Sequence, residues 1–124
     1  MKRFLFLTSL LVTSALPASA LTEGEIRQCN ALAATFGPKK AEFDALTAAR
    51  DELAAAAETA GEDWENAEAL RDFGADKAAA ADAKKATYDE ALIAFEATQR
   101  TWQTAGQQLN ADFATFNATC TADD

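Results

Sequence analysis

Histidine is absent from this chain, and several other residue types are absent once the first 20 residues are set aside. The 104 residues that remain contain no serine, valine or methionine, and only one proline. The chain therefore lacks the commonest general base, the commonest metal ligand and a serine nucleophile after residue 20. It is also poor in the β-branched aliphatic residues that favour strands, with no valine and two isoleucines, whereas 29 of these residues are alanine, the best helix former. The sequence predicts an all-α fold, no enzymatic activity and no catalytic residue.

The five glycines are isolated from one another, so no phosphate-binding loop and no cofactor site are predicted. Carboxylates are the only abundant reactive groups, and Glu62, Asp63, Glu65 and Glu68 cluster around Trp64. On a helix such a cluster is typical of a solvated face. We therefore predict no metal site. Weak binding of calcium or magnesium through these oxygens is kept as an alternative, because both ions prefer oxygen ligands.

Residues 1–20 have the pattern of a secretory signal peptide. Lys2 and Arg3 give a positive start, an apolar run covers residues 4–12, and Ala18-Ser19-Ala20 matches a cleavage site. We expect cleavage after Ala20, a periplasmic or secreted location, and a single helical domain over residues 21–124. No later segment is long and apolar enough to span a bilayer, which takes about 20 residues.

The chain is strongly acidic, with 20 Asp and Glu against 11 Lys and Arg. Its formal charge of −9 becomes −11 when Lys2 and Arg3 are removed, since 9 basic residues then face the same 20 acidic ones. Such a charge disfavours nucleic acid and anionic lipid as partners. A protein partner, or self-association, is the expected kind of interaction.

The chain has two cysteines, Cys29 and Cys120. In an oxidising compartment the default for two cysteines is a disulfide. Their wide separation in the sequence and the absence of a C-x-x-C motif argue against a redox-active pair. We predict a structural disulfide between them.

Two long segments show the alternating spacing of three and four residues that marks a helix with one buried seam. The clearer of the two seams ends on a cysteine and consists of Lys85, Tyr88, Leu92, Phe95, Gln99, Trp102, Gly106, Leu109, Phe113, Phe116 and Cys120. The other seam contains smaller side chains and consists of Phe43, Leu46, Arg50, Leu53, Ala57, Ala60, Trp64, Ala67 and Arg71. Before it, Ile26, Cys29, Ala33 and Phe36 give a short apolar face.

A fold in which the chain turns back at Gly74 brings the two seams together. Cys29 then meets Cys120, and large residues meet small ones, as Phe43 meets Gly106 and Tyr88 meets Ala60. The preferred architecture is therefore a long antiparallel helical hairpin, resembling a coiled coil in its seam. It would carry a kink at Gly37-Pro38, where proline removes a helical hydrogen bond.

The alternative architecture uses Gly61 as a further turn and gives a three- or four-helix bundle. Leu32, Leu70 and Ile93 lie off the seams, where they are either scattered surface residues or a second stripe for self-association. The leading functional hypothesis is a non-enzymatic exported structural or interaction protein. The alternatives are a periplasmic chaperone-like holder of unfolded exported proteins and a weak divalent-cation-binding envelope protein.

Overall fold

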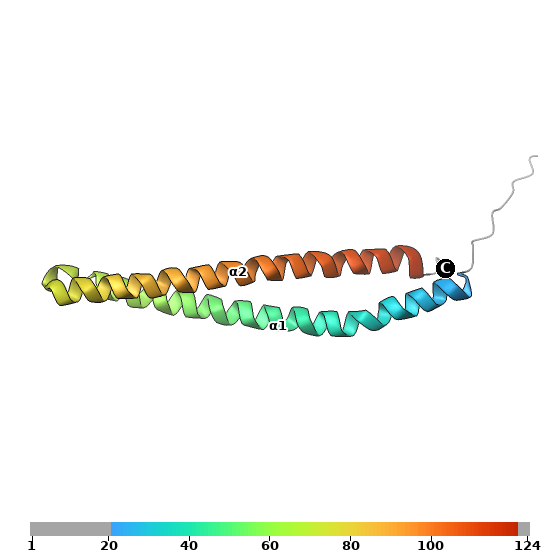
Figure 1. Cartoon of the computed structure of the whole chain (residues 1–124), viewed down its shortest axis with the longest axis horizontal. Helices are drawn as coiled ribbons and strands as arrows, with labels where there is room; N and C mark the ends of the chain where they lie inside the picture. The colour runs from blue at the N-terminus through green and yellow to red at the C-terminus, as the bar shows by residue number, and fades with distance from the viewer. Residues whose placement is uncertain (1–20, 122–124) are drawn as a thin grey trace, which may run out of the picture.

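Two long helices joined by a short turn make up the computed structural model, which describes residues 21–121. Helix α1 spans Glu23–Glu68, the 3-10 helix η1 spans Arg71–Phe73, and helix α2 spans Ala75–Cys120. Each long helix has 46 residues and is therefore about 69 Å long at 1.5 Å per residue. Figure 1 shows α1 and α2 running side by side as a hairpin. The all-α fold and the hairpin are confirmed, whereas the predicted signal peptide, residues 1–20, lies outside the described residues.

Helix α1 begins with a capping box. The backbone N–H of Glu25 donates to Thr22 Oγ1 at 3.2 Å, and the backbone N–H of Thr22 donates to Glu25 Oε2 at 2.6 Å. Two amides that would otherwise have no partner in the first turn are satisfied in this way. The bond from the Thr22 amide lowers the pKa of the Glu25 carboxyl below its usual value.

Pro38 lies inside α1, and the helix continues through it. Proline lacks an N–H, so one hydrogen bond of the helical ladder is missing at this point and the helix can bend there. Figure 1 shows α1 changing direction in the blue-green part of the ribbon, near residue 40. Gly61, in contrast, is an ordinary helical residue of α1. The alternative bundle with a turn at Gly61 is therefore wrong.

The turn between the helices depends on Gly74. Its φ of 146° is the only positive φ among residues 21–121, and this conformation is one that glycine adopts without steric penalty. Gly74 is also the N-cap of α2, and no side chain caps that end of the helix. The predicted position of the turn is confirmed.

The helices keep one register from the disulfide to the turn. Cys29 is bonded to Cys120, and the Phe36 ring stacks on the Phe113 ring with centroids 4.4 Å apart. Two aromatic rings that lie close to glycines keep the same register. The Phe43 ring lies against Gly106, and the Tyr88 ring lies against Gly61. Within each of these four pairs the two residue numbers add up to the same total. The Tyr88 contact is one residue from the predicted partner, Ala60.

The core of the hairpin is thin. Among the described residues only Ala57 and Ala81 are buried, and both lie in the half nearer the turn. Alanine lets the helix axes approach closely there, whereas aromatic rings hold them apart farther along. In Figure 1 the two ribbons overlap in the turn half and are seen side by side in the half nearer the disulfide.

Candidate interaction surfaces

The acidic cluster around Trp64 is divided between ion-paired and exposed side chains. Glu68 accepts two hydrogen bonds from Arg71 at 2.9 Å, and Asp63 forms an ion pair with Lys84 at 3.6 Å. Glu62 and Glu65 are exposed on α1. Within residues 21–121, no three acidic or cysteine side chains come together in a way that would hold a metal ion. The cluster is arranged as a solvated helix face with ion pairs.

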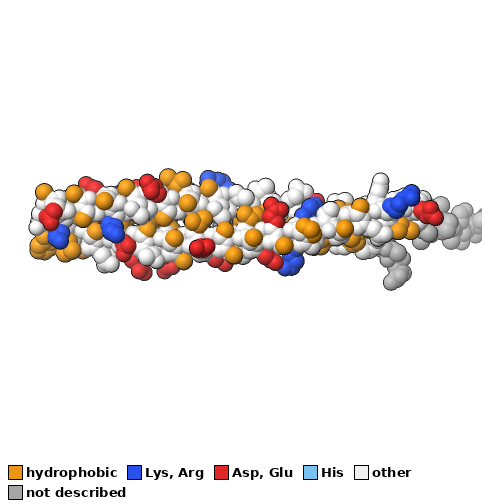
Figure 2. Space-filling model, turned by 60° about the horizontal axis from the view of Figure 1, so that its bottom comes forward, with side chains coloured by type: hydrophobic (Ala, Val, Ile, Leu, Met, Phe, Trp, Pro, Cys, Tyr) orange, Lys and Arg blue, Asp and Glu red, His pale blue; other side chains and the backbone are white. Residues whose placement is uncertain are grey.

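The turn end of the hairpin presents two large apolar side chains to solvent. Phe73 in η1 is 79% exposed and Leu70 just before it is 46% exposed. In the space-filling view, hydrophobic side chains gather at the left-hand end, which is the turn end (Figure 2). We call Leu70 and Phe73 the apolar tip.

The apolar tip is held by an ion-pair network. Arg71 donates to Glu68 on α1 and to Asp82 on α2, the latter at 2.7 Å. The bond from Arg71 lowers the pKa of the Glu68 carboxyl, and the two carboxylates raise the pKa of Arg71. Arg71 thus links both helices across the turn, two residues before Phe73.

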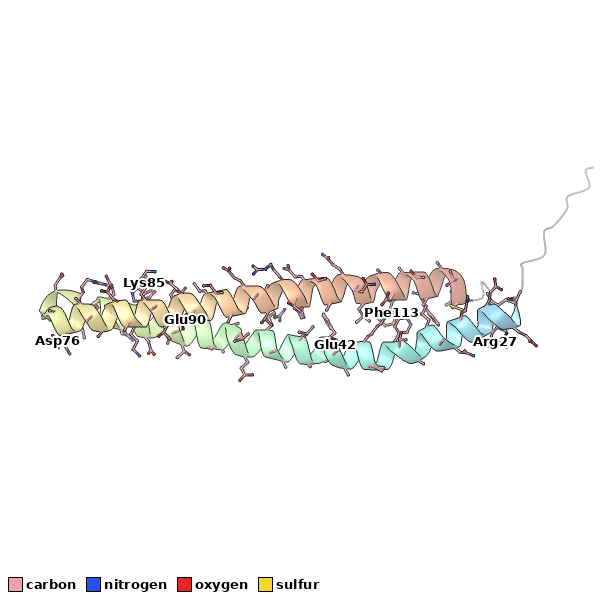
Figure 3. All side chains as sticks on the ribbon, viewed as in Figure 1. Arg27, Glu42, Asp76, Lys85, Glu90 and Phe113 are labelled. Atoms are coloured by element: carbon pink, nitrogen blue, oxygen red, sulfur yellow. A yellow bond between two sulfur atoms is a disulfide. The ribbon has the colours of Figure 1, made fainter. Side chains whose placement is uncertain are left out.

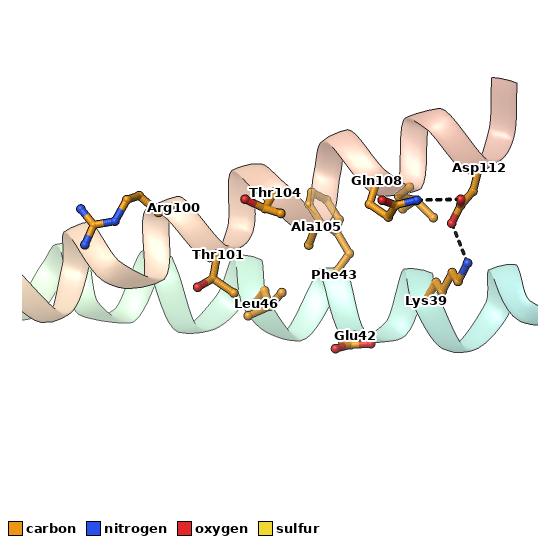
Figure 4. A pocket seen from close by; sticks show the side chains of 11 residues that line it. Lys39, Glu42, Phe43, Leu46, Arg100, Thr101, Thr104, Ala105, Gln108 and Asp112 are labelled. Carbon is orange, nitrogen blue, oxygen red and sulfur yellow. Dashed lines mark hydrogen bonds and ion pairs between the residues drawn. The ribbon is translucent and has the colours of Figure 1, made fainter.

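The second surface is a groove of about 570 Å³ between α1 and α2, in the half nearer the disulfide. Its walls are mostly apolar or small, and the residues that line it are Lys39, Glu42, Phe43, Leu46, Arg100, Thr101, Thr104, Ala105, Gln108, Leu109 and Asp112. Figure 4 shows Phe43 and Leu46 lying between the two ribbons, opposite Thr101 and Ala105. The groove exists because Phe43 and Trp102 hold the helices apart while Ala105 and Thr101 are too short to fill the space beside them. The Phe43 and Trp102 rings are stacked with centroids 5.7 Å apart.

One end of the groove is closed by a polar contact between the helices. Lys39 Nζ donates to Asp112 Oδ2 at 2.6 Å, and Gln108 Nε2 donates to Asp112 Oδ1 at 3.0 Å (Figure 4). The bond from Lys39, followed by that from Gln108, lowers the pKa of the Asp112 carboxyl. Glu42 and Arg100 line the same groove, and neither forms an ion pair with any residue in 21–121.

Polar seam residues are accommodated by the aromatic rings. The Arg50 guanidinium lies 4.1 Å above the Trp102 ring centroid and pairs with Asp51, and Lys85 Nζ lies 5.5 Å from the Trp64 centroid. The Trp102 indole N–H donates to Thr47 Oγ1 at 2.8 Å. These cation–π and hydrogen-bonding interactions lie within the hairpin. They engage the ring faces of Trp102 and Trp64 and the indole N–H of Trp102.

The structure confirms the disulfide between Cys29 and Cys120, whose Cα atoms are 5.6 Å apart. The three residues predicted to lie off the seams do not share one environment. Leu32 is half-buried beside the disulfide, whereas Leu70 and Ile93 are exposed, Ile93 by 66%. The predicted short face was wrong in part, because Ile26 and Ala33 are exposed, whereas Leu32 is half-buried together with Cys29 and Phe36.

The exposed Phe73 and the groove between the helices were not predicted from the sequence. The available signal for Phe73 was its position as an aromatic residue next to the turn glycine. The signal for the groove was the row of short side chains that flanks the large seam residues of α2, such as Thr101 and Ala105. Phe113 was correctly placed in the seam and reaches from α2 toward α1 (Figure 3), although its ring stays 40% exposed.

Comparison of the chain with models of protein families, with curated proteins and with solved structures finds no match in any of the three. Neither α1 nor α2, the two long helices of residues 21–121, has a stretch long and apolar enough to cross a membrane. The two surfaces described above are therefore the observations on which a functional proposal can rest.

Proposed function

We propose that this chain is an exported, non-enzymatic interaction protein whose apolar tip, Leu70 and Phe73, binds a protein partner. The single observation that carries the proposal is Phe73, a large aromatic side chain that is 79% exposed at the end of a long hairpin. Aromatic residues are enriched among the anchors that supply most of the energy of protein interfaces. The hairpin would hold this anchor at a distance from its opposite end.

Two further features support this proposal. Histidine and serine, the commonest general base and a common nucleophile, are missing after residue 20, and the two cysteines are joined to each other. The acidic residues near the tip, such as Glu68, Asp72 and Asp82, would favour a partner whose apolar pocket is bordered by basic residues. The signal-peptide pattern of residues 1–20 supports a periplasmic or secreted location for this interaction.

The test uses a photo-reactive amino acid at position 73, with crosslinking in the native host. Asn66, which is exposed on α1, is the matched control position. We expect one or a few specific adducts from position 73 and none from position 66. No adduct at position 73, or the same adducts at both positions, would contradict the proposal.

A second candidate function uses the same observation. An exposed apolar tip would also suit a chaperone-like holder that contacts unfolded exported proteins. In that case position 73 would crosslink to many different proteins, and the purified chain would suppress aggregation of an unfolded client. Phe73→Asp should remove that suppression, and an unchanged effect would rule out the tip as the client-binding surface.

A further inference from the structure

The apolar groove between α1 and α2 has the size and the lining of a small-molecule site. Its volume of about 570 Å³ lies within the range of about 300–1,000 Å³ that is usual for such sites. Phe43, Leu46 and Leu109 make much of its surface apolar, which is also typical of ligand sites. We propose that the groove binds a long-chain carboxylate of the fatty-acid type. This inference does not rest on the tip contact proposed above, because the groove lies nearer the disulfide and the apolar tip at the turn.

The shape of the groove favours a rod-like ligand. On α2 its lining residues run from Arg100 to Asp112, which are twelve residues apart, or about 18 Å along the helix axis. Because Phe43 lies level with Gly106, the side chains of Leu109, Phe43 and Leu46 follow one another along this length. The apolar surface is therefore a slot between two helices, which an extended hydrocarbon chain fills better than a compact molecule.

Charge gives the ligand a direction in this slot. Residues 21–121 contain nine Lys and Arg side chains, and six of them form ion pairs within this part of the chain. Of the other three, Arg27, Lys77 and Arg100, only Arg100 lines the groove. Figure 4 shows Arg100 at one end of the groove and the contact of Lys39 with Asp112 at the other. A carboxylate at the Arg100 end would gain a charge-assisted hydrogen bond.

The opposite end of the groove is unsuited to an anionic group. Lys39 is already engaged by Asp112, which also accepts a hydrogen bond from Gln108. Glu42 follows Lys39 by about one turn of α1 and adds a carboxylate that forms no ion pair within residues 21–121. An anion near these two carboxylates would be repelled. The hydrocarbon end of the ligand therefore belongs here, and its carboxylate belongs beside Arg100.

Tryptophan fluorescence can locate such a ligand on the purified oxidised protein. Trp102 stacks on Phe43 at the groove, whereas Trp64 stacks on Tyr88 in the turn half. In the register of the hairpin Trp64 lies level with Lys85, fifteen residues or about 22 Å along the axis from Arg100. The probe is oleic acid brominated across its double bond, because bromine in the middle of the chain quenches an indole only at short range.

We expect saturable quenching in Trp64→Phe, which keeps only Trp102, and none in Trp102→Phe, which keeps only Trp64. The Kd should lie at about 1–100 µM, because a groove covers an apolar chain less completely than a closed cavity does. Ala105→Leu fills the groove and should weaken binding at least about tenfold. Ala114→Leu, at an exposed position of α2 that does not line the groove, is the matched control and should leave binding unchanged.

The role of Arg100 is tested with two competitors that displace the probe, oleic acid and oleyl alcohol. The original protein should prefer the acid, and Arg100→Gln should weaken binding of the acid about fivefold while leaving that of the alcohol unchanged. Arg27→Gln, an equal change of charge at an exposed position outside the groove, should alter neither. Far-ultraviolet circular dichroism checks that all variants keep their helices. Thr101→Leu, at an exposed position of the groove wall, replaces Ala105→Leu if that variant unfolds.

Four results would overturn the proposal. The first is no saturable quenching up to the solubility limit of the brominated acid, which would leave the groove to a protein partner. The second is equal quenching in Trp102→Phe, which would place the ligand elsewhere. The third is unchanged affinity in the groove-filling variant. The fourth is equal affinity for acid and alcohol in the original protein. None of these results bears on crosslinking from position 73, so the ligand site and the tip contact can fail separately.

Discussion

The Phe43 ring lies so close to Gly106 that a Cβ atom on residue 106 would stand 3.2 Å from Phe43 Cε2. The same relationship recurs nearer the turn, where a Cβ on Gly61 would stand 3.1 Å from Tyr88 Cε2. The two rings differ in their surroundings. Both rings stack on a tryptophan with centroids 5.7 Å apart, Phe43 on Trp102 and Tyr88 on Trp64, but only Phe43 also borders the open groove. The two glycines therefore tolerate a methyl group differently.

We predict that Gly61→Ala is less stable than Gly106→Ala. Alanine in place of glycine adds about 1 kcal/mol of helix propensity at both positions. At position 106 the Phe43 ring can shift toward the groove, so the free energy of unfolding should stay within about 1 kcal/mol of the original or rise. At position 61 overpacking against Tyr88 should offset the gain and leave a net loss of about 1 kcal/mol. Denaturant unfolding measures both variants, and an equal or greater stability of Gly61→Ala would contradict this account.

Much of the fold was predictable because large and small residues alternate between the two seams. Pairing Cys29 with Cys120 fixes the register, and that register places Phe43 against Gly106 as observed. A glycine in a helical pattern is ambiguous by itself, which is why Gly61 was compatible with a turn. The structure resolves the ambiguity, because the close approach of Tyr88 gives this glycine a packing role within α1.

The candidate surfaces were less predictable. A seam pattern describes the residues that face the other helix, and the groove depends on the short residues beside the seam, such as Ala105 and Thr101. The exposure of Phe73 depends on the path of the chain through η1 and Gly74. Neither property is a periodic feature of the sequence, so a periodicity analysis does not detect it.

We predict that the disulfide secures the open end of the hairpin. The bond joins residues 91 positions apart, and closing a loop of that size contributes roughly 4–5 kcal/mol in the chain-entropy model, with about 2–4 kcal/mol typical of measurements. The double variant Cys29→Ala with Cys120→Ala avoids a free thiol, and its free energy of unfolding should fall by roughly 2–5 kcal/mol, which spans both figures. Hydrogen exchange should show loss of protection first near residues 23–36 and 113–120, with protection retained around Ala57 and Ala81. Equal loss along the whole hairpin would contradict the assigned role.

We predict that Phe36→Ala lowers the free energy of unfolding, whereas Phe73→Ala leaves it almost unchanged. The Phe36 ring contacts Phe113 at 4.4 Å and Phe116 at 5.5 Å between centroids, so its removal should cost about 2–3 kcal/mol for a half-buried ring. Phe73 is 79% exposed, so its removal should change the free energy of unfolding by less than about 0.5 kcal/mol. Thermal unfolding of the two variants provides the comparison. A large loss of stability in Phe73→Ala would mean that the ring packs on the hairpin and is not a free anchor.

We predict that the contact between Lys39 and Asp112 makes part of the stability depend on pH. Hydrogen bonds from Lys39 and then Gln108 lower the pKa of Asp112 in the folded state, so folding favours its charged form. This contribution is fully present above the ordinary aspartate pKa of about 3.9 and is lost as the pH falls through the lower folded-state pKa.

Asp112→Asn should therefore be less stable than the original protein at pH 6–7, and the difference should shrink as the pH falls below about 4. Thermal unfolding from pH 7 to pH 2 measures both proteins. Asp44→Asn is the matched control, because the ion pair of Asp44 with Lys40 links neighbouring turns of α1 and no contact between the helices is removed. If the difference between Asp112→Asn and the original protein stayed constant over the whole pH range, the bond from Lys39 would not be what favours the charged form of Asp112.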